Sequence, residues 1–293
     1  MTNIAFLGTG LLGSAFVEAA LKRGDVVTVW NRTAEKARAL EALGARVAKS
    51  PADAVRGAER VHLVLKDDAV VEDVIAALRP GLDPKTIVLD HTTTQPALTA
   101  KRAQRLAHEG VRYLHCPVFI GPDAARREKG TILVSGPKAL FDAVEPALKR
   151  MAEKVEYLGE RPDLGAVYKL CGNAFIIGIN ALVADVLSVA SGASVDAAPA
   201  LSVVEMFNAS AIITGRGKNM AARQFEPTFE LTMARKDVRL MIETAGPLPL
   251  STLPGIAERM DVLISEGHGD RDLAVMGRDA VTPKAPPAGR FAR

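Results

Sequence analysis

A glycine-rich turn near the amino terminus has the spacing of a phosphate-binding loop. The residues Gly8-Thr9-Gly10-Leu11-Leu12-Gly13 follow the apolar run Ile4 to Leu7, which is typical of a buried parallel strand. Gly8 permits a tight turn, Gly10 lets a pyrophosphate approach the backbone, and Gly13 lets the next helix pack closely on the sheet. The helix dipole then favours negative charge at the turn. The pattern predicts a dinucleotide site, against the alternative of an ordinary strand-to-helix turn.

The next strand indicates which dinucleotide binds. Val26 to Trp30 is apolar and ends in Asn31-Arg32-Thr33. Enzymes that prefer NAD usually place a carboxylate here to hold the ribose 2′-hydroxyl, and a carboxylate would repel a 2′-phosphate. A guanidinium instead pairs with that phosphate. We interpret the segment as specificity for NADP; the alternative is that Arg32 is a solvated surface charge.

A third group of polar residues has the spacing of a proton-transfer site. Lys169, Asn173 and Asn180 interrupt the apolar segment 166–191 at positions i, i+4 and i+11. On a helix they fall within roughly 40° of one another, on one face. Burial lowers the pKa of a lysine and makes it a suitable proton donor or acceptor, which Asn173 could orient. The alternative is that Lys169 extends into solvent from the first helical turn.

Alternating strands and helices are expected to position the first two groups. Strands are predicted near 4–7, 26–30, 46–48, 61–65, 86–89, 112–116, 132–135 and 155–157, and helices at 11–22, 34–43, from 51, at 68–78, from 96 and at 138–151. This alternation is typical of an α/β fold with a doubly wound, mainly parallel sheet. We predict an NADP-binding Rossmann domain over residues 1–162.

The rest of the chain reads as helices. Segments 166–191, 197–208, 228–245 and 253–266 predict an all-helical C-terminal domain over 163–281, for the substrate and for dimerisation. The first helix is apolar on nearly every side, but Lys169, Asn173, Asn180 and Asp185 argue against a membrane span. A partner subunit would cover such a helix, so we expect a homodimer. Residues 282–293 are rich in Pro, Ala and Arg and are expected to be a disordered tail.

Composition narrows the classes of function. The 293 residues carry a net charge of +3, which gives no electrostatic case for nucleic acid or membrane. The two cysteines, Cys116 and Cys171, have neither metal-ligand spacing nor a disulfide framework, so no metal is predicted. The chain starts in a strand with no basic-then-apolar signal region, and we expect it to be cytoplasmic. A small-molecule substrate is the expected partner.

An ordered set of motifs resembles a known family. These are the opening glycine turn, Thr92-Thr93 after a strand, Gly130-Thr131, the segment from Lys169 to Asn173 and Lys236-Asp237. Together they resemble the β-hydroxyacid dehydrogenases, which include 3-hydroxyisobutyrate dehydrogenase and glyoxylate/succinic semialdehyde reductases and are related to 6-phosphogluconate dehydrogenase. The resemblance covers Asn3 to about Val281.

The resemblance implies a role for each of these positions. Lys169 would be the catalytic acid/base and Asn173 would position the substrate. Lys236, supported by Asp237, would lie near the nicotinamide and the substrate. Thr93 would lie against the nicotinamide ribose, and Leu65 and Lys66 beside the cofactor.

The substrate loop departs from the family pattern. Where the family usually has Pro-Val-Ser-Gly-Gly, this chain has Phe119 and Ile120 before Gly121. A substrate carboxylate would lose a hydroxyl donor there, so we expect a more apolar carbonyl compound. The loop also resembles that of imine reductases. The leading hypothesis is an NADP-dependent carbonyl reductase; the alternatives are an imine or ketone reductase with an apolar pocket, and a non-catalytic NADP-sensing protein.

Overall fold

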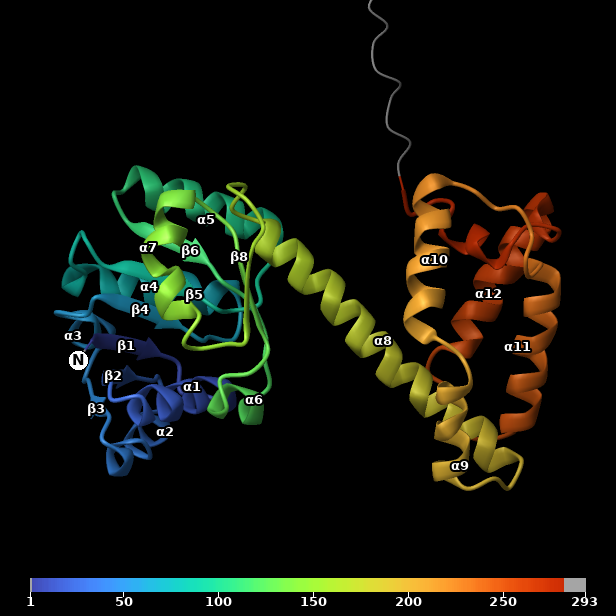
Figure 1. Cartoon of the computed structure of the whole chain (residues 1–293), viewed down its shortest axis with the longest axis horizontal. Helices are drawn as coiled ribbons and strands as arrows, with labels where there is room; N and C mark the ends of the chain where they lie inside the picture. Colours follow the sequence, from blue (N-terminus) through green and yellow to red (C-terminus); the bar gives the residue numbers. More distant parts are fainter. Residues whose placement is uncertain (1, 282–293) are drawn as a thin grey trace, which may run out of the picture. The chain divides into compact units, whose positions relative to one another are not determined.

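The computed structural model describes residues 2–281, which form two compact units divided between Asn173 and Ala174 (Figure 1). The division falls inside a long helix, whose first residues belong to the N-terminal unit. The boundary predicted at 162 lies just before that helix begins. The tail predicted over 282–293 lies outside the described residues.

The N-terminal unit is built on a six-stranded parallel sheet. Its strands are β1 (Asn3–Leu7), β2 (Val26–Trp30), β3 (Arg46–Val47), β4 (Arg60–Leu63), β5 (Ile87–Asp90) and β6 (Arg112–His115). They lie in the order β3-β2-β1-β4-β5-β6, and every neighbouring pair is parallel. This is the order of a doubly wound nucleotide-binding sheet, so the predicted Rossmann fold is confirmed.

Both faces of this sheet are buried. In β1, Ile4 and Phe6 contribute to one hydrophobic cluster, and Ala5 and Leu7 contribute to a second. Because successive side chains of a strand point to opposite faces, the two clusters lie on opposite sides of the sheet. Parallel sheets are typically covered in this way, which explains why their strands are apolar throughout.

Short helices connect the strands and cover the faces. They are α1 (Leu11–Lys22), α2 (Ala34–Arg38), α3 (Pro51–Val55), α4 (Asp68–Leu78), α5 (Pro96–His108), α6 (Pro122–Arg126) and α7 (Lys138–Leu148), with 3₁₀ turns η1 (Glu41–Leu43) and η2 (Arg79–Gly81). The single helix predicted over 34–43 is wrong. α2 stops at Arg38, and a separate 3₁₀ turn ends at Gly44, which has a φ of 99° that favours glycine.

Three strands form a second, smaller sheet: β7 (Val118–Phe119), β8 (Thr131–Val134) and β9 (Lys154–Tyr157). β7 runs antiparallel to β8, with Phe119 opposite Thr131, and β8 is parallel to β9. The strands predicted near 132–135 and 155–157 therefore exist but do not extend the main sheet. β7, with only two residues, was not predicted, because so short a strand has no periodicity to detect.

The C-terminal unit is helical, as predicted. Its elements are the long helix α8 (Leu164–Gly192), which begins in the N-terminal unit, then α9 (Ala197–Ser202), η3 (Val203–Met206), α10 (Ala209–Ala222), α11 (Leu231–Ala245), α12 (Leu253–Leu263), the π-helical turn η4 (Ile264–His268) and η5 (Leu273–Gly277). A small core joins α11, α12 and η5 through residues such as Val238, Leu263 and Val275. α10 was not predicted, and the helix expected over 197–208 is a short helix followed by a 3₁₀ turn.

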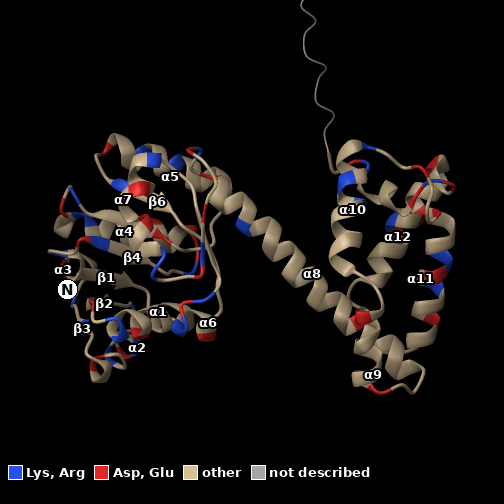
Figure 2. Ribbon diagram, in the orientation of Figure 1, with Lys and Arg blue, Asp and Glu red and all other residues tan. Residues whose placement is uncertain are grey.

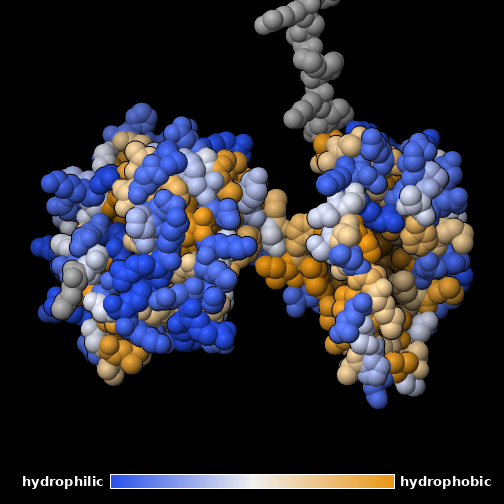
Figure 3. Space-filling model, in the orientation of Figure 1, coloured by the Kyte–Doolittle hydropathy of each residue, from blue (hydrophilic) through white to orange (hydrophobic). Residues whose placement is uncertain are grey.

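Helix α8 is apolar and largely uncovered in the single chain. Lys169 and Asp185 are its only charged residues, and Figure 2 shows it almost entirely without charge. Hydrophobic residues cover its middle in Figure 3, and only 6% of its most apolar stretch is buried. By length and apolarity alone it could span a membrane, as could the bent pair Ala197–Met206 and Ala209–Ala222. The expectation that α8 does not span a membrane remains a prediction from the sequence.

Candidate functional site

A cavity of about 630 Å³ opens beside the glycine turn, in the N-terminal unit. It lies beyond the carboxyl ends of β1, β2 and β4, where nucleotides bind in doubly wound sheets. Of the predicted cofactor residues, those lining it are Gly8, Gly10, Asn31, Arg32, Thr33, Leu65 and Lys66; Trp30, Lys36, Pro51, Val64, Val70, Asp73, Val74 and Ala77 complete the lining.

Each of the three glycines of the turn has a different structural role. Gly8 has a φ of +100°, and a Cβ there would lie 2.1 Å from the Val64 carbonyl oxygen. A Cβ on Gly13 would lie 2.0 Å from the Gly8 carbonyl oxygen, so only glycine lets α1 pack this closely. Gly10 has no protein atom within 4 Å of a Cβ position, which leaves open space beside the backbone of the turn. These are the positions that a bound pyrophosphate requires.

Asn31 connects this turn to the end of β2. Its Oδ1 accepts a hydrogen bond from the Thr9 backbone N–H at 3.0 Å, and its Nδ2 donates to the Thr33 carbonyl at 2.9 Å. The hydroxyl of Thr9 is buried and has no hydrogen-bond partner among the described residues. A buried hydroxyl without a partner costs free energy, and a phosphate oxygen at the turn would satisfy it. The residues therefore fit a dinucleotide.

Two exposed cations line the same cavity at the end of β2. Neither Arg32 nor Lys36 has an ion-pair partner among residues 2–281, so both are available to an anionic ligand. Lys36 was missed by the sequence interpretation, because a lysine at the start of a surface helix carries no local signal of a site. Lys66 adds a third cation, close to Asp67, and Asp73 is the carboxylate of the lining.

The loop after β5 is bonded to the cavity wall. The Leu65 backbone N–H donates to the Thr92 Oγ1 at 3.1 Å, and the Thr92 N–H donates to Asp90 Oδ1 at 3.0 Å. Thr92 and Thr94 are buried, whereas Thr93 between them is exposed. The sequence interpretation placed Thr93 beside the nicotinamide ribose, and the structure leaves its side chain exposed while fixing both neighbours.

A buried polar network supports this loop from below. Tyr113 donates its hydroxyl hydrogen to Asp90 Oδ2 at 2.8 Å. Burial, reinforced by the adjacent carboxylate, raises the pKa of Tyr113, so it stays a neutral donor. His115 Nε2 lies 2.9 Å from the Thr92 carbonyl oxygen, and burial lowers the pKa of His115. Arg102, with a fully buried side chain, pairs with Asp68 at 2.6 Å and with Glu72 at 2.7 Å.

Lys169 and Asn173 meet on the first turns of α8. Lys169 Nζ donates to Asn173 Oδ1 at 2.8 Å. The same nitrogen lies 4.4 Å from the centre of the Phe119 ring, within the range of a cation–π interaction. Burial lowers the pKa of Lys169. Asn180, in contrast, donates to the Ile176 carbonyl of its own helix at 2.8 Å, so it does not join the pair.

The substrate loop lies against this part of α8. Phe119 in β7 and Ile120 are half-buried, and Gly121 precedes α6 with open space around its Cβ position. A Cβ on Gly172 would lie 2.2 Å from the Phe119 Cζ atom. The loop therefore presents an aromatic ring to the helix turn that carries Lys169.

Lys236 belongs to the C-terminal unit. It lies on α11 with its Nζ 3.0 Å from Asp237 Oδ1, the carboxylate expected to support it. Both side chains are partly exposed.

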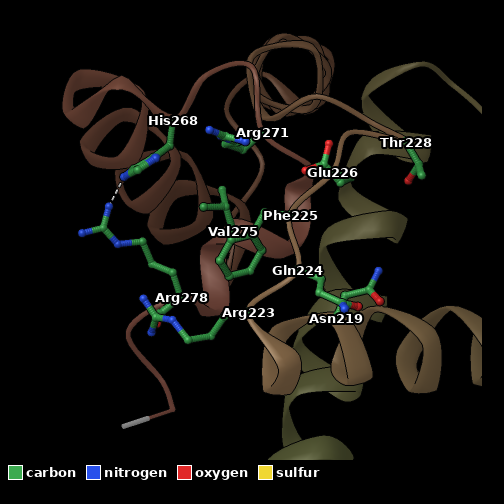
Figure 4. A pocket seen from close by; sticks show the side chains of 10 residues that line it. All are labelled: Asn219, Arg223, Gln224, Phe225, Glu226, Thr228, His268, Arg271, Val275 and Arg278. Atoms are coloured by element: carbon green, nitrogen blue, oxygen red, sulfur yellow. Dashed lines mark hydrogen bonds between the residues drawn. The ribbon is translucent and has the colours of Figure 1, made fainter. Parts of the chain in front are cut away.

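A cavity of about 900 Å³ also lies in the C-terminal unit (Figure 4). It is lined by Asn219, Arg223, Gln224, Phe225, Glu226, Thr228, His268, Arg271, Val275 and Arg278, none of which was predicted as a site residue. Arg278 contacts His268, as the dashed line in Figure 4 shows, and pairs with Glu266 and Asp279. Acidic neighbours therefore partly neutralise the cations of this cavity.

Comparison with known proteins agrees with the geometry of the N-terminal unit. Residues 3–159 match the NAD-binding domain of 6-phosphogluconate dehydrogenase, and residues 164–278 match the NAD-binding region of NADP-dependent 3-hydroxyisobutyrate dehydrogenase. The chain belongs to the β-hydroxyacid dehydrogenase family. As a member of this oxidoreductase family, it has a nicotinamide dinucleotide site.

Relatives of this family member differ in length and description. It is 27% identical to an uncharacterized oxidoreductase of Bacillus subtilis over 282 residues, which cover 94% of this chain and 98% of the relative. It is 28% identical over 244 residues to the cytokine-like nuclear factor N-PAC of Homo sapiens. The matched residues cover 82% of this chain but only 44% of that protein. The chain therefore spans less than half the length of the N-PAC proteins it matches.

Solved structures show the same fold. A reductive aminase from Aspergillus terreus, in complex with NADPH4, cyclohexanone and allyl amine, superposes with a TM-score of 0.83 at 22% identity, covering 94% of this chain and 98% of that one. An imine reductase from Pseudomonas sp. has a TM-score of 0.84 at 23% identity, with the same coverage of both chains. The expected likeness to imine reductases is confirmed at the level of the fold.

Proposed function

We propose that this protein is an NADP-dependent reductase that transfers a hydride between NADPH and a small carbonyl compound with an apolar substituent. The pair formed by Lys169 and Asn173, partly buried against Phe119, carries the proposal. The chain thus has both a dinucleotide cavity and, at Lys169, a partly desolvated amine whose position is fixed by a hydrogen bond.

The residues around the glycine turn would hold the cofactor. The backbone of the turn and the Thr9 hydroxyl suit the pyrophosphate, and Arg32 and Lys36 suit a 2′-phosphate, because two exposed cations there favour NADP over NAD. When bound, NADPH supplies the hydride that reduces the carbonyl carbon.

Lys169 would supply the proton. Hydride addition leaves negative charge on the carbonyl oxygen, and the Lys169 ammonium both stabilises that charge and donates a proton to the oxygen, forming the alcohol. Burial lowers the pKa of this amine, which eases proton release. Asn173 accepts a hydrogen bond from Lys169 and so fixes the direction of its ammonium group. Lys236 and Asp237 are proposed to act on the nicotinamide side of the substrate.

The substrate loop supports an apolar substrate. Phe119 and Ile120 offer no side-chain donor to a carboxylate, and Pro122, at the start of α6, has no backbone N–H. A carboxylate held there would lose water without the hydroxyl donor of the family loop to replace it, which is costly.

We propose that the protein acts as a cytoplasmic homodimer through its helical unit. The exposed apolar residues Phe175, Ile176, Ile177 and Ile179 of α8 support this, because exposed apolar surface of this extent marks an interaction site. Ile177→Asp should shift the protein to monomer in size-exclusion chromatography with light scattering. An unchanged mass would refute the interface.

The reaction is tested by NADPH oxidation with an apolar aldehyde, succinic semialdehyde, glyoxylate and a cyclic imine. We expect the apolar aldehyde to react fastest. Lys169→Ala should lower carbonyl reduction by roughly 100-fold or more, whereas Lys101→Ala, which removes an exposed lysine of α5, should not. Near-normal activity of Lys169→Ala would refute the proton-donor role.

A C=N substrate is the second candidate. The names of the structural neighbours and the aromatic ring at Phe119, whose face attracts cations, favour it. A charged Lys169 opposes it, because it would repel a protonated iminium. Turnover of the cyclic imine alone would replace the first proposal with this one. Tight NADPH binding without any turnover would favour an NADP-sensing protein.

A further inference from the structure

The Phe119 ring points directly at the backbone of α8. A Cβ atom on Gly172 would lie 2.2 Å from Phe119 Cζ, 2.6 Å from Cε1 and 3.2 Å from Cε2. All three distances are shorter than the usual contact of a side-chain carbon, so the tip of the ring occupies the volume where any other residue would have a side chain. Gly172 therefore serves packing here, since its helical backbone needs no special conformational freedom.

The backbone of Phe119 is also closely packed. Phe119 pairs with Thr131 across β7 and β8, and the neighbouring Gly130 has a φ of +98°. A Cβ on Gly130 would lie 2.7 Å from the Phe119 carbonyl oxygen and 2.9 Å from Ile120 Cγ1. Gly172 on α8 thus makes room for the Phe119 ring, and Gly130 in the turn before β8 makes room for the Phe119 backbone and Ile120.

The face of the same ring contacts the Lys169 amine. Residues 169 and 172 are three positions apart and so lie on the same face of α8. The Lys169 Nζ lies 4.4 Å from the ring centre and 2.8 Å from Asn173 Oδ1. The ammonium is therefore held by an aromatic face and by an amide oxygen, and neither contact is a carboxylate that would hold its proton tightly.

We propose that Phe119 is a positioning residue that holds the Lys169 ammonium for proton transfer, and that Gly172 is the socket that makes this possible. The inference rests on the proposed role of Lys169 and deepens it. It makes positions 119 and 172 a coupled pair, in which changing either one displaces the amine. It also supports an apolar substrate, since an aromatic ring stands where the family pattern has a serine hydroxyl.

Four full-length variants test the pair. These are Phe119→Leu, which keeps apolar volume without the aromatic face; Phe119→Tyr, which keeps the aromatic face but adds a hydroxyl to the Cζ atom that faces Gly172; Gly172→Ala; and the double variant Phe119→Leu/Gly172→Ala. Gly255→Ala is the matched control, because Gly255 is an exposed helix glycine with no protein atom within 4 Å of its Cβ position. Each is measured for the pH dependence of kcat and kcat/KM and for NADPH binding by fluorescence.

Phe119→Leu should lower kcat about tenfold and move the alkaline limb of the pH profile to lower pH by roughly half a unit to one unit, because loss of a cation–π contact destabilises the ammonium. Phe119→Tyr should lower kcat as Gly172→Ala does, because its hydroxyl on Cζ would meet the α8 backbone at Gly172. Gly172→Ala should also lower kcat, and the double variant should lose less than the product of the two single effects, since leucine vacates the ring's position. NADPH binding should not change.

An unmoved alkaline limb in Phe119→Leu, or independent effects at 119 and 172, would overturn the proposal. Thermal unfolding of the same four variants distinguishes failure of the positioning proposal from failure of the proposed function. If Lys169→Met keeps its activity, the acid role fails, yet coupling between 119 and 172 in unfolding temperature would still show the socket. If Lys169→Met is inactive but the pH limb does not respond to Phe119, only the positioning role fails.

Discussion

Asp185 lets the stability of the helical unit be tested quantitatively. It lies on α8 with 1% of its surface exposed. Its carboxylate accepts backbone hydrogen bonds from Ser251 at 2.5 Å, from Thr252 at 2.8 Å and from Leu253 at 2.8 Å, and one from the Thr252 hydroxyl at 2.6 Å. These groups begin α12, so Asp185 caps that helix from a different element, where its charge also complements the helix dipole.

The pKa of Asp185 gives the size of the effect. Burial opposes its ionisation, but the hydrogen bonds from Thr252, Ser251 and Leu253 outweigh burial and lower the pKa from 3.8 to about 2. Each pKa unit corresponds to about 1.4 kcal/mol, so Asp185→Asn should lower the free energy of unfolding by about 2 kcal/mol at pH 7. Because the native pKa is depressed, this contribution is complete above the unfolded pKa and is lost as pH falls from about 4 towards 2.

Urea unfolding followed by circular dichroism at 222 nm measures this difference. Asp196→Asn is the control, because Asp196 precedes α9 without a side-chain capping bond. The gap between wild type and Asp185→Asn should be constant from pH 7 to pH 5 and should narrow below pH 4. Equal effects of the two substitutions, or a gap that ignores pH, would refute the capping argument.

Three further predictions concern the N-terminal unit. Gly13→Ala should raise the KM for NADPH at least tenfold and lower the unfolding temperature, because its Cβ would lie 2.0 Å from the Gly8 carbonyl oxygen; steady-state kinetics and calorimetry check both. Arg32→Ala and Lys36→Ala should each raise the KM for NADPH with little change for NADH, whereas an equal loss with both cofactors would contradict their role. Burial lowers the pKa of His62 and His91, that of His91 to about 4, so below about pH 6.5 the unfolded chain binds protons that the folded chain does not. The free energy of unfolding should therefore fall from about pH 6.5 towards pH 4, by up to about 1.4 kcal/mol per pH unit for each histidine. In urea unfolding, His62→Gln should make this pH dependence less steep.

The N-terminal fold was predictable because the local sequence patterns of its turns and strands agree with the tertiary structure. The glycine turn satisfies backbone geometry that any strand-to-helix phosphate loop requires, so its residues reveal it without knowledge of the neighbours. The apolar strands are buried on both faces and read as continuous runs. The same reasoning failed at α10, where Gly215 and Gly217 reduce helix propensity and no apolar face repeats.

The contacts of the substrate loop could not be predicted in the same way. The sequence shows that Phe119 departs from the family pattern, but its contact with Gly172 joins a two-residue strand to a helix position more than fifty residues later. Lys36 was missed for another reason: a lysine in the first turns of a surface helix is ordinary, and only the cavity distinguishes it. Such properties depend on the spacing of elements, which local patterns do not encode.

The two hydrogen bonds of Asn31 have a consequence for redesign of the cofactor preference. An exchange of Asn31 for aspartate is the obvious route to an enzyme that uses NADH, since a carboxylate would hold a ribose hydroxyl. Aspartate could still accept from the Thr9 N–H, but it could not donate to the Thr33 carbonyl, so the turn that carries Arg32 would lose the hydrogen bond that fixes its shape. Ribose recognition and pyrophosphate recognition are thus mechanically linked through one amide. A successful redesign would neutralise Arg32 and Lys36 and leave Asn31 in place.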